Sequence, residues 1–197
     1  MEWLNLTKWA TLDLTKKAPS LTTIKVGLGW DVDSSVSMDL DVAAFVSEAG
    51  SDKITDMGKI CFFNQKAILN SAILHAWDNR TGEGEGDDES ISIDLAKVVS
   101  EVPNVSEIHF AVFIHEPATA DVTFGKVKNS FIRIVNDDTD EEIARYKLED
   151  DYFSSRAINF GKLVKGSDGN WNFKAVWEEI VGQVADATQS TFDHFTK

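Results

Sequence analysis

The sequence has little of what stabilises small secreted proteins or anchors a chain in a membrane. Its one cysteine, Cys61, excludes an internal disulfide and favours a reducing compartment. No apolar run approaches the roughly 18 residues of a membrane-spanning helix, and residues 1–17 lack the apolar stretch of a secretory signal. We therefore expect a cytoplasmic protein in which Cys61 is buried as a small apolar residue.

Basic residues are also scarce. The chain has 19 lysine and arginine residues against 33 aspartate and glutamate residues, and its formal net charge is -14. Nucleic-acid binding needs clustered lysine and arginine to neutralise phosphates, and the sequence shows no basic stripe. We therefore expect no nucleic-acid partner. Most of the acidic residues are expected to form a solvated, mutually repulsive surface.

What the sequence does contain is a series of short β-compatible runs separated by turn residues. With 197 residues, 43% of them hydrophobic, the chain can bury one sizeable core. The regular spacing predicts a mainly β fold, a β-sandwich of two sheets with short helices, over residues 1–177. The runs are 23–29, 39–46, 59–63, 71–77, 90–95, 107–115, 130–135, 142–148, 157–164 and 171–177.

Two of these runs and the C-terminal segment carry a clear periodicity. In 39–46 the alternation puts both aspartates on the face opposite Leu40, and the run from Ile108 to Ile114 is apolar on both faces, which favours a central strand. Apolar residues at roughly helical spacing predict a C-terminal helix from Glu178 to Phe195, within residues 178–197. Its polar face lacks lysine and arginine, so packing on the sandwich is favoured over a membrane-surface or partner-binding role.

Two acidic clusters stand apart from the general acidity. The downstream acidic cluster, residues 78–89 (DNRTGEGEGDDE), holds six carboxylates and three alternating glycines, and the upstream acidic cluster, residues 29–41 (GWDVDSSVSMDLD), holds four aspartates. Calcium takes about six to eight oxygen ligands at flexible geometry, whereas magnesium demands a stricter octahedron. Together the clusters predict a calcium site built by loops that are distant in the sequence.

Other interpretations of the downstream cluster fit less well. A phosphate-binding loop needs GxGxxG spacing and a lysine, and these carboxylates would repel an anion. An EF-hand loop has acidic or amide ligands at its third and fifth positions and glycine at its sixth, where this chain has Arg80, Gly82 and Glu83. A plain acidic surface turn, whose glycines only permit positive φ, stays open as the alternative.

Several motifs together resemble the TerD family of tellurium-resistance and general stress-response proteins. They are GLGWD at 27–31, DLD at 39–41, DNRTGEGEGDDE at 78–89, NSFIRIVN at 129–136 and EIARYKL at 142–148. The resemblance runs from about Leu4 to Ala175. It implies a β-sandwich with calcium-binding loops at one end, operons linked to tellurite resistance, phage inhibition and colicin tolerance, and no known enzymatic chemistry.

Carried over position by position, the resemblance implies a set of metal ligands, and the number of carboxylates, which one Ca²⁺ cannot neutralise, indicates two ions. Gly82 would contribute its carbonyl because a residue without Cβ lets the backbone approach an ion, and Asp88 would serve the second ion. Trp30 and Trp77, each directly before a proposed ligand, are expected to wedge the loops onto the core. The candidate ligands are Asp31, Asp39, Asp41, Asp78, Asn79, Gly82, Asp87, Asp88 and Glu89.

Electrostatics adds the hypothesis of a sensor or adaptor whose loops are ordered by Ca²⁺. Its expected partners are other proteins of a stress-response or tellurium-resistance complex. Without metal, crowded carboxylates repel one another and raise each other's pKa, so calcium is expected to order the loops. Direct tellurite chemistry would favour clustered thiols or a basic anion pocket, which an acidic chain with one cysteine does not suggest. Any resistance is therefore expected to be indirect.

Two alternative functions use the same acidic residues. A metal-dependent hydrolase could take His75, His109 or His115 as a base, although a lone histidine on an apolar strand is more often a packed core residue, and no GxSxG motif is present. A membrane-surface scaffold is the other alternative, because calcium can bridge carboxylates to anionic lipid and so support peripheral membrane association. The sequence does not fix the oligomeric state.

Overall fold

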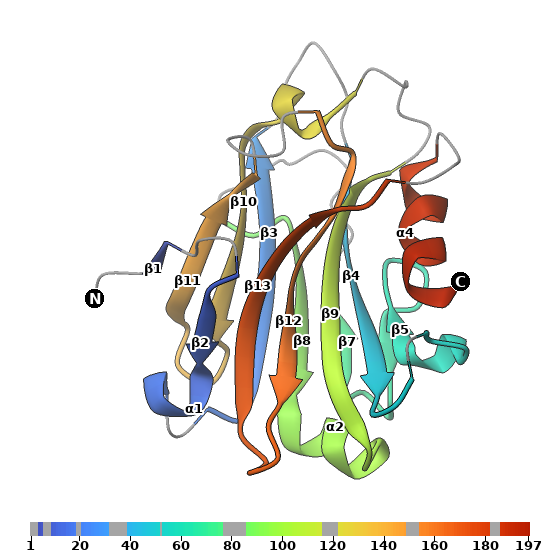
Figure 1. Ribbon diagram of the computed structural model, residues 1–197. Helices are drawn as coiled ribbons and strands as arrows, with labels where there is room; N and C mark the ends of the chain where they lie inside the picture. The colour runs from blue at the N-terminus through green and yellow to red at the C-terminus, as the bar shows by residue number, and fades with distance from the viewer. Residues whose placement is uncertain are drawn as a thin grey trace.

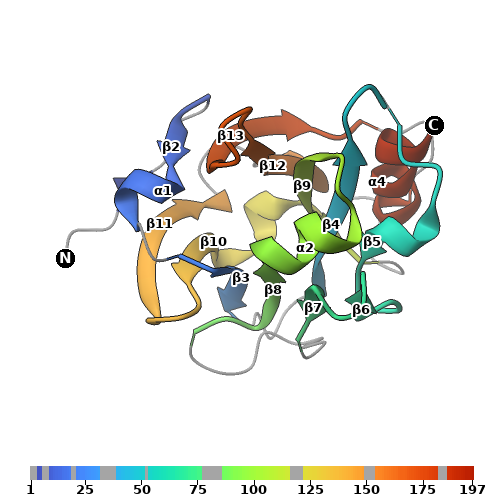
Figure 2. The ribbon, with the colours of Figure 1, turned by 90° about the horizontal axis from the view of Figure 1, so that it is seen from below.

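The chain folds into two β-sheets packed face to face, as the sequence predicts. The computed structural model describes residues 4–5, 9–18, 21–31, 39–51, 53–76, 86–115, 122–148, 154–181 and 186–197. Seen from below, the two sheets form two layers, with the short helix α2 (Leu95–Glu101) between their lower ends (Figure 2). Apart from one parallel pair at an edge, the strand pairs are antiparallel.

The strands of both sheets run along the long axis of the molecule in Figure 1. The first sheet has the order β1 (Leu4–Asn5), β11 (Glu141–Lys147), β10 (Lys128–Asn136), β3 (Thr23–Asp31), β8 (Glu89–Asp94), β7 (Ile73–His75) and β6 (Ala67–Ile68). The second has the order β2 (Thr11–Asp13), β13 (Trp171–Glu179), β12 (Ala157–Lys165), β9 (Val105–Ile114), β4 (Leu40–Glu48) and β5 (Ile60–Cys61).

The core lies between the sheets and follows the alternation of the strands. On β4, Leu40 and Val42 belong to the cluster between the sheets, whereas Ala43 and Phe45 belong to a second cluster on the outer face. β9 lies between β12 and β4, and its residues 110–114 are buried on both faces, which confirms the predicted central strand. Cys61 is free and buried as expected, and burial raises the pKa of its thiol to about 12.

The outer cluster is closed by the C-terminal helix α4 (Ala187–Thr196), on the right of Figure 1. The Phe195 ring stacks on Phe45 with centroids 4.1 Å apart. This confirms that the helix packs on the sandwich, but its predicted start was wrong. β13 continues to Glu179, because its last residues pair with β12, and α4 begins only after Asp186, whose side chain accepts a hydrogen bond from the Gln189 N–H at 2.9 Å.

Other elements are shorter than predicted or lie where none was expected. The runs 59–63 and 71–77 contribute only two and three strand residues, and positive φ angles at Asn70 and Ser71 form a turn just before β7. Strands β1, β2 and β6 and helices α1 (Leu14–Lys17) and α2 (Leu95–Glu101) were not predicted. Short 3-10 turns cover 57–59 and 124–126. In the described part of the chain, no helix combines the length and apolarity needed to cross a membrane.

Candidate metal site at one end of the sandwich

The described acidic residues of both clusters gather at one end of the sandwich, the upper end in Figure 1. β3 ends there at Asp31, Asp39 directly precedes β4, and β8 begins there at Glu89. The antiparallel register explains this placement, because Leu28 near the end of β3 pairs with Glu89 at the start of β8. Segments 47 or more residues apart are therefore brought to one edge of the fold.

Two hydrogen bonds tie the acidic clusters to each other. The Trp30 N–H donates to Oδ2 of Asp88 at 2.9 Å, and the Val42 N–H donates to Oε2 of Glu89 at 2.9 Å. The Asp88 N–H in turn donates to the Leu28 carbonyl at 2.8 Å. Trp30 itself is buried in the core, as expected of a residue that fixes the loop. The described parts of the two clusters therefore lie side by side.

Glu89 links the two sheets at this end. Its side chain shares the inward face of β8 with Ile91 and is only 1% exposed, and it reaches the backbone of β4 in the other sheet. The Nε2 atom of His75 on β7 lies 3.5 Å from its Oε2. Burial acts to lower the pKa of His75, but the hydrogen bond and charge of Glu89 raise it above its ordinary value overall. A buried carboxylate needs such partners, because an isolated buried charge is very unfavourable.

Asp41 is equally buried but faces the other way. It lies on the outer face of β4, is 1% exposed, and its Oδ2 atom lies 3.0 Å from Nδ1 of His115, the residue that follows β9. The backbone N–H of His115 donates to the Asp39 carbonyl at 2.8 Å. The edge-on ring of Phe63 packs against the His115 ring, with centroids 4.8 Å apart. Asp41 therefore lies on the face of the strand opposite Leu40, as the period of two predicts.

Asp87 is bound by an arginine from a different strand. Nε and the second terminal nitrogen of Arg133 on β10 donate to its two carboxylate oxygens at 2.6 and 2.9 Å, which is the bidentate geometry of strong ion pairs. The carboxylate lies over Gly27, where a Cβ would collide with it. Glycine at position 27 is therefore required for this ion pair to lie against the sheet.

Asp31 also has a partner that sequence analysis did not identify. The side-chain amide of Asn129 donates to its Oδ2 atom at 2.5 Å. Asn129 follows the first residue of β10 and adopts a positive φ of 51°, a conformation that asparagine tolerates better than most residues. The NSFIRIVN motif therefore supplies two side chains, Asn129 and Arg133, that hold acidic residues of the predicted site.

The predicted ligand set is only partly within the described residues. Asp78, Asn79 and Gly82, together with Trp77, lie outside the described residues. Within the described ranges, no group of three or more His, Cys, Asp or Glu side chains is arranged so that it could hold a metal ion. The donor chemistry of carboxylates suits calcium. A site at this end would therefore need ligands from residues 77–85 in addition to those described here.

The three histidines considered as bases all have structural partners. His75 is buried against Glu89, and His115 pairs with Asp41. His109 lies 3.0 Å from Glu107 in the middle of the second sheet, away from the acidic end. Only the pair of His109 and Glu107 is local in the sequence, whereas the partners of His75 and His115 come from other strands and could not be identified from the sequence.

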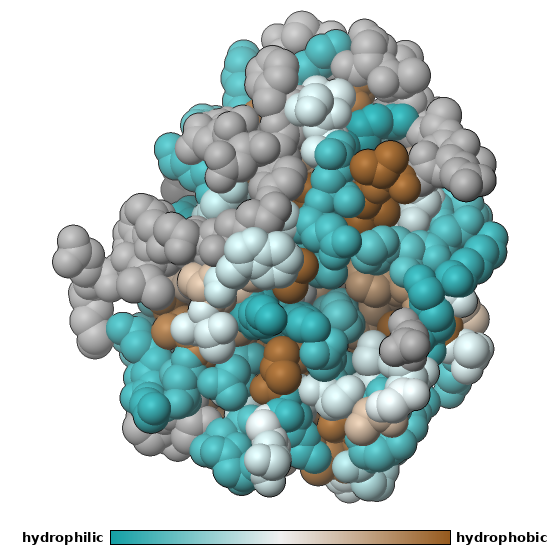
Figure 3. Space-filling model, viewed as in Figure 1, coloured by the Kyte–Doolittle hydropathy of each residue, from teal (hydrophilic) through white to brown (hydrophobic). Residues whose placement is uncertain are grey.

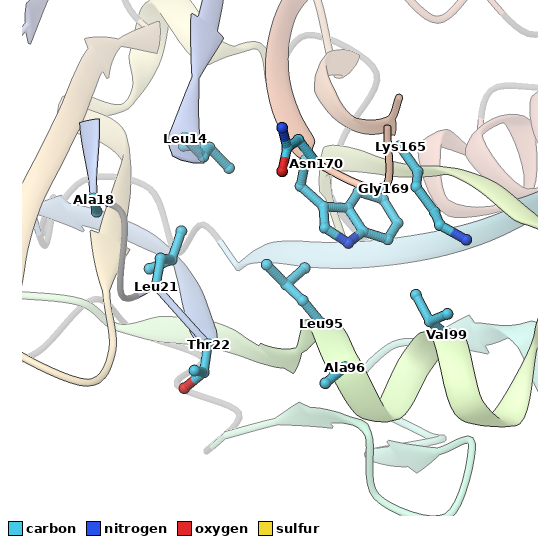
Figure 4. A pocket seen from close by; sticks show the side chains of 11 residues that line it. Leu14, Ala18, Leu21, Thr22, Leu95, Ala96, Val99, Lys165, Gly169 and Asn170 are labelled. Carbon is cyan, nitrogen blue, oxygen red and sulfur yellow. The ribbon is translucent and has the colours of Figure 1, made fainter. Parts of the chain in front are cut away.

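A different concave site lies at the opposite end of the molecule. An apolar pocket of about 520 Å³ opens between α1, α2 and the turn that joins β12 to β13 (Figure 4). Leu14, Leu21, Leu95 and Val99 point into it from two sides, and Lys165 lies at its rim. It contains none of the candidate metal ligands, so the apolar pocket and the acidic end are separate features.

This geometry defines the class of protein: a β-sandwich of two sheets with acidic residues gathered at the strand ends on one edge. The TerD domain model matches residues 3–190. The chain is 40% identical to the tellurium resistance protein TerD of Serratia marcescens and 37% identical to general stress protein 16U of Bacillus subtilis. Each alignment covers 92% of this chain and 93% of the relative. The chain belongs to the TerD family.

Solved structures show the same fold. A homologue of the telluride resistance protein TerD from Streptomyces coelicolor superimposes with a TM-score of 0.73 at 19% identity, over 90% of this chain and 100% of the other. At this level of identity the likeness concerns the fold alone. It agrees with the β-sandwich predicted from the spacing of the strands.

Proposed function

We propose that the chain is a calcium-binding stress-response protein of the tellurium-resistance type, acting in the cytoplasm without enzymatic chemistry. The observation that carries the proposal is the pair of hydrogen bonds, from Trp30 to Asp88 and from Val42 to Glu89, that joins the two acidic clusters. Carboxylates that are distant in sequence but adjacent in space are the usual basis of a calcium site with flexible geometry. The names of its relatives, which refer to tellurium resistance and general stress, support the physiological context.

The described carboxylates are not equally suited to bind the metal. Both oxygens of Asp87 accept hydrogen bonds from Arg133, so we assign Asp87 mainly to holding the loop rather than to coordinating an ion. Asp31, Asp39 and Asp88 lie closer to the surface than Asp41. A carboxylate has about four lone-pair positions, so one hydrogen bond leaves room for a metal. With Asp78, Asn79 and Gly82, and with Glu89 on the inner and Asp41 on the outer side of the sandwich end, these residues would supply the ligands of two ions.

Calcium would act here by ordering the acidic end. Without metal, neighbouring carboxylates repel one another, and the bound ion would remove that repulsion. Binding to the folded state alone stabilises it by about 2.7 kcal/mol when free calcium is a hundredfold above Kd. The ordered end would then present a surface to other proteins of a stress-response or tellurium-resistance complex. This is a sensor or adaptor role.

Two variants with the same change in charge test the proposal. Asp39→Asn removes a carboxylate from the acidic end, whereas Glu101→Gln removes one from the exposed end of α2 at the opposite end of the sandwich. Calcium at about 5 mM would be roughly a hundredfold above a sub-millimolar Kd. We expect it to raise the melting temperature of the wild type and of Glu101→Gln above the values measured in EGTA. Asp39→Asn should lose most of that increase. Equal calcium responses in all three proteins would contradict the proposed site.

A further inference from the structure

A cleft on the outer face of the second sheet gathers basic residues that are far apart in the sequence. It has a volume of about 360 Å³ and crosses β13, β12, β9 and β4, beside the C-terminal end of α4. Figure 3 looks onto this face, on which hydrophilic side chains predominate. Among the described residues that line it are Lys53, Lys162, Lys174, His109 and His194, with Glu178 as the one carboxylate.

This concentration of cations contrasts with the chain as a whole, in which acidic residues outnumber basic ones by 33 to 19. This cluster of cations could not be predicted from the sequence, because the three lysines come from the loop after β4, from β12 and from β13. Lys162 and Lys174 face each other as paired residues of neighbouring strands. Like charges directly opposite each other on a sheet destabilise it, so an arrangement of this kind favours a bound anion.

Some of these basic side chains already make hydrogen bonds or ion pairs with neighbouring groups. Nζ of Lys162 donates to Oε1 of Glu107 at 2.6 Å, and His109 binds the other oxygen at 3.0 Å. Nζ of Lys53 donates to the backbone carbonyl of His194 at 2.7 Å. Within the described residues, Lys174 makes no such contact. Lys162 is therefore held in place by Glu107, whereas Lys174 is available to a ligand.

The floor of the cleft is irregular in a way that is common beside binding sites. The registers of β12 with both of its neighbours shift between Asn159 and Gly161, which marks a β-bulge. On the facing strand Trp177 adopts a positive φ of 53°, which is strained for a bulky residue. Asn159 is buried at the floor, and its amide is satisfied when its nitrogen faces the carbonyls of Gly161 and Phe110, at 3.3 and 3.2 Å.

An aromatic side chain forms one end of the cleft. Trp9 is 58% exposed, an unusual state for a large apolar residue, and its backbone N–H donates to the Ala175 carbonyl at 3.0 Å, which fixes it beside β13. Val176 also lines the cleft. From β13 to β4 the cleft spans three strand intervals, about 14 Å at the usual strand spacing. This length exceeds what an inorganic ion would fill.

We propose that this cleft binds a small organic phosphate, with the phosphate group on Lys174 and Lys162 and a flat ring of the ligand against Trp9. Lysine ammonium groups make short, charge-assisted hydrogen bonds to phosphate oxygens, and an exposed indole face stacks on planar rings. The cleft contains none of the residues of the acidic clusters, so we expect ligand binding there to be independent of calcium. An anion site of this kind is compatible with the strongly negative net charge, because the cations are concentrated in one place.

The test compares phosphate-bearing probes by NMR. Adenosine 5′-monophosphate, ribose 5-phosphate and adenosine are titrated in EGTA into ¹⁵N-labelled protein. The proposal expects adenosine 5′-monophosphate to shift the backbone amides of His109, Lys162 and Lys174, ribose 5-phosphate to bind more weakly, and adenosine to bind least. Trp9→Ala should remove the advantage of adenosine 5′-monophosphate over ribose 5-phosphate.

A pair of variants with the same change in charge distinguishes binding in the cleft from a general electrostatic attraction between the ligand and the protein. Lys174→Glu lies in the cleft, whereas Lys147→Glu lies at the exposed end of β11 in the other sheet. Lys174→Glu should weaken binding of adenosine 5′-monophosphate by about tenfold or more through the lost charge-assisted contact, and Lys147→Glu by less than about twofold. Lys174→Ala repeats the measurement should the glutamate variant not fold. Equal losses in the Lys174 and Lys147 variants, equal binding of adenosine, or unshifted cleft amides would each overturn the proposal.

Discussion

At the scale of single residues, the acidic end of the sandwich is built from carboxylates with individual partners. Asp87 binds Arg133, Asp31 binds Asn129, and Glu89 binds the backbone of β4. The candidate acids could be recognised from their clustering in the sequence. Their partners could not, because Arg133 and Asn129 lie about forty residues or more downstream and reach the site only through the pairing of β10 with β3.

The contact between Gly27 and Asp87 gives a direct prediction on stability. In Gly27→Ala the new methyl group would collide with the Asp87 carboxylate and displace it from Arg133. Overpacking of this kind destabilises by about 1–3 kcal/mol, which urea unfolding would measure. The same substitution in an Asp87→Ala background should have a clearly smaller effect. A penalty of equal size in both backgrounds would show that the carboxylate is not what the methyl group meets.

The ion pairs of Glu107 predict a pH dependence. Hydrogen bonds and charges from His109 and Lys162 lower the pKa of this partly buried carboxyl from 4.5 to about 2, against the opposing effect of burial. Because the folded-state pKa lies below the ordinary value, ionised Glu107 stabilises the fold above pH 4.5, and this contribution is lost as the pH falls from 4.5 towards 2.

Glu107→Gln should therefore be less stable than the wild type at pH 6, and the difference should shrink as the pH is lowered below 4.5. Chemical unfolding at a series of pH values measures both quantities. Glu101→Gln, at the exposed end of α2, serves as the control and should follow the wild-type curve. If the difference in unfolding free energy between the wild type and Glu107→Gln did not change with pH, the proposed ion pairs of Glu107 would be contradicted.

At the scale of elements, the strands were largely predictable and the short segments were not. The long strands β3, β4 and β9 to β13 all contain a predicted run, because alternation over seven or more residues is a strong signal. Short apolar runs such as 59–63 do not define the bounds of a strand, because these depend on pairing with strands that are distant in the sequence. The starts of α1, α2 and α4 had a signal in the sequence, since the side chains of Asp13, Asp94 and Asp186 each accept a hydrogen bond from the backbone N–H three residues later.

The late start of α4 follows from competition between two structures for one segment. Apolar residues after position 178 have nearly helical spacing, but Glu178 and Glu179 belong to β13, and Ile180 donates its N–H to the Ala157 carbonyl of β12. Tertiary pairing therefore overrides the local pattern. The helix forms where Asp186 can cap it and where its apolar side chains reach the outer cluster.

The packing of α4 leads to a prediction at this scale. Phe195 is 7% exposed and stacks on the fully buried Phe45, so Phe195→Ala would leave a cavity on the outer face. Phe to Ala changes in cores destabilise by about 3–5 kcal/mol, and we expect the lower part of that range here because the site borders solvent. Gln189→Ala, exposed on the same helix, should change stability by less than about 0.5 kcal/mol. Similar values for both variants in urea unfolding would show that α4 does not close the outer cluster.

At the scale of the whole molecule, the chain separates its charges by region. The described residues of the acidic clusters lie at one end, the apolar pocket lies at the other, and the basic cleft crosses the outer face of the second sheet. The net charge of -14 is a property of the chain as a whole and says nothing about this arrangement. The family and the fold were predictable from motifs and spacing, whereas the cleft required the three-dimensional structure.

Calorimetric titration of calcium into the metal-free chain tests the central proposal most directly. The wild type is compared with Asp78→Ala and with Glu101→Gln as a matched loss of one carboxylate. We expect about two bound ions per chain in the wild type and in Glu101→Gln, since one ion cannot neutralise so many carboxylates, and reduced binding in Asp78→Ala. Absence of calcium binding by the wild type, or binding that Asp78→Ala leaves unchanged, would contradict a calcium site at the acidic end.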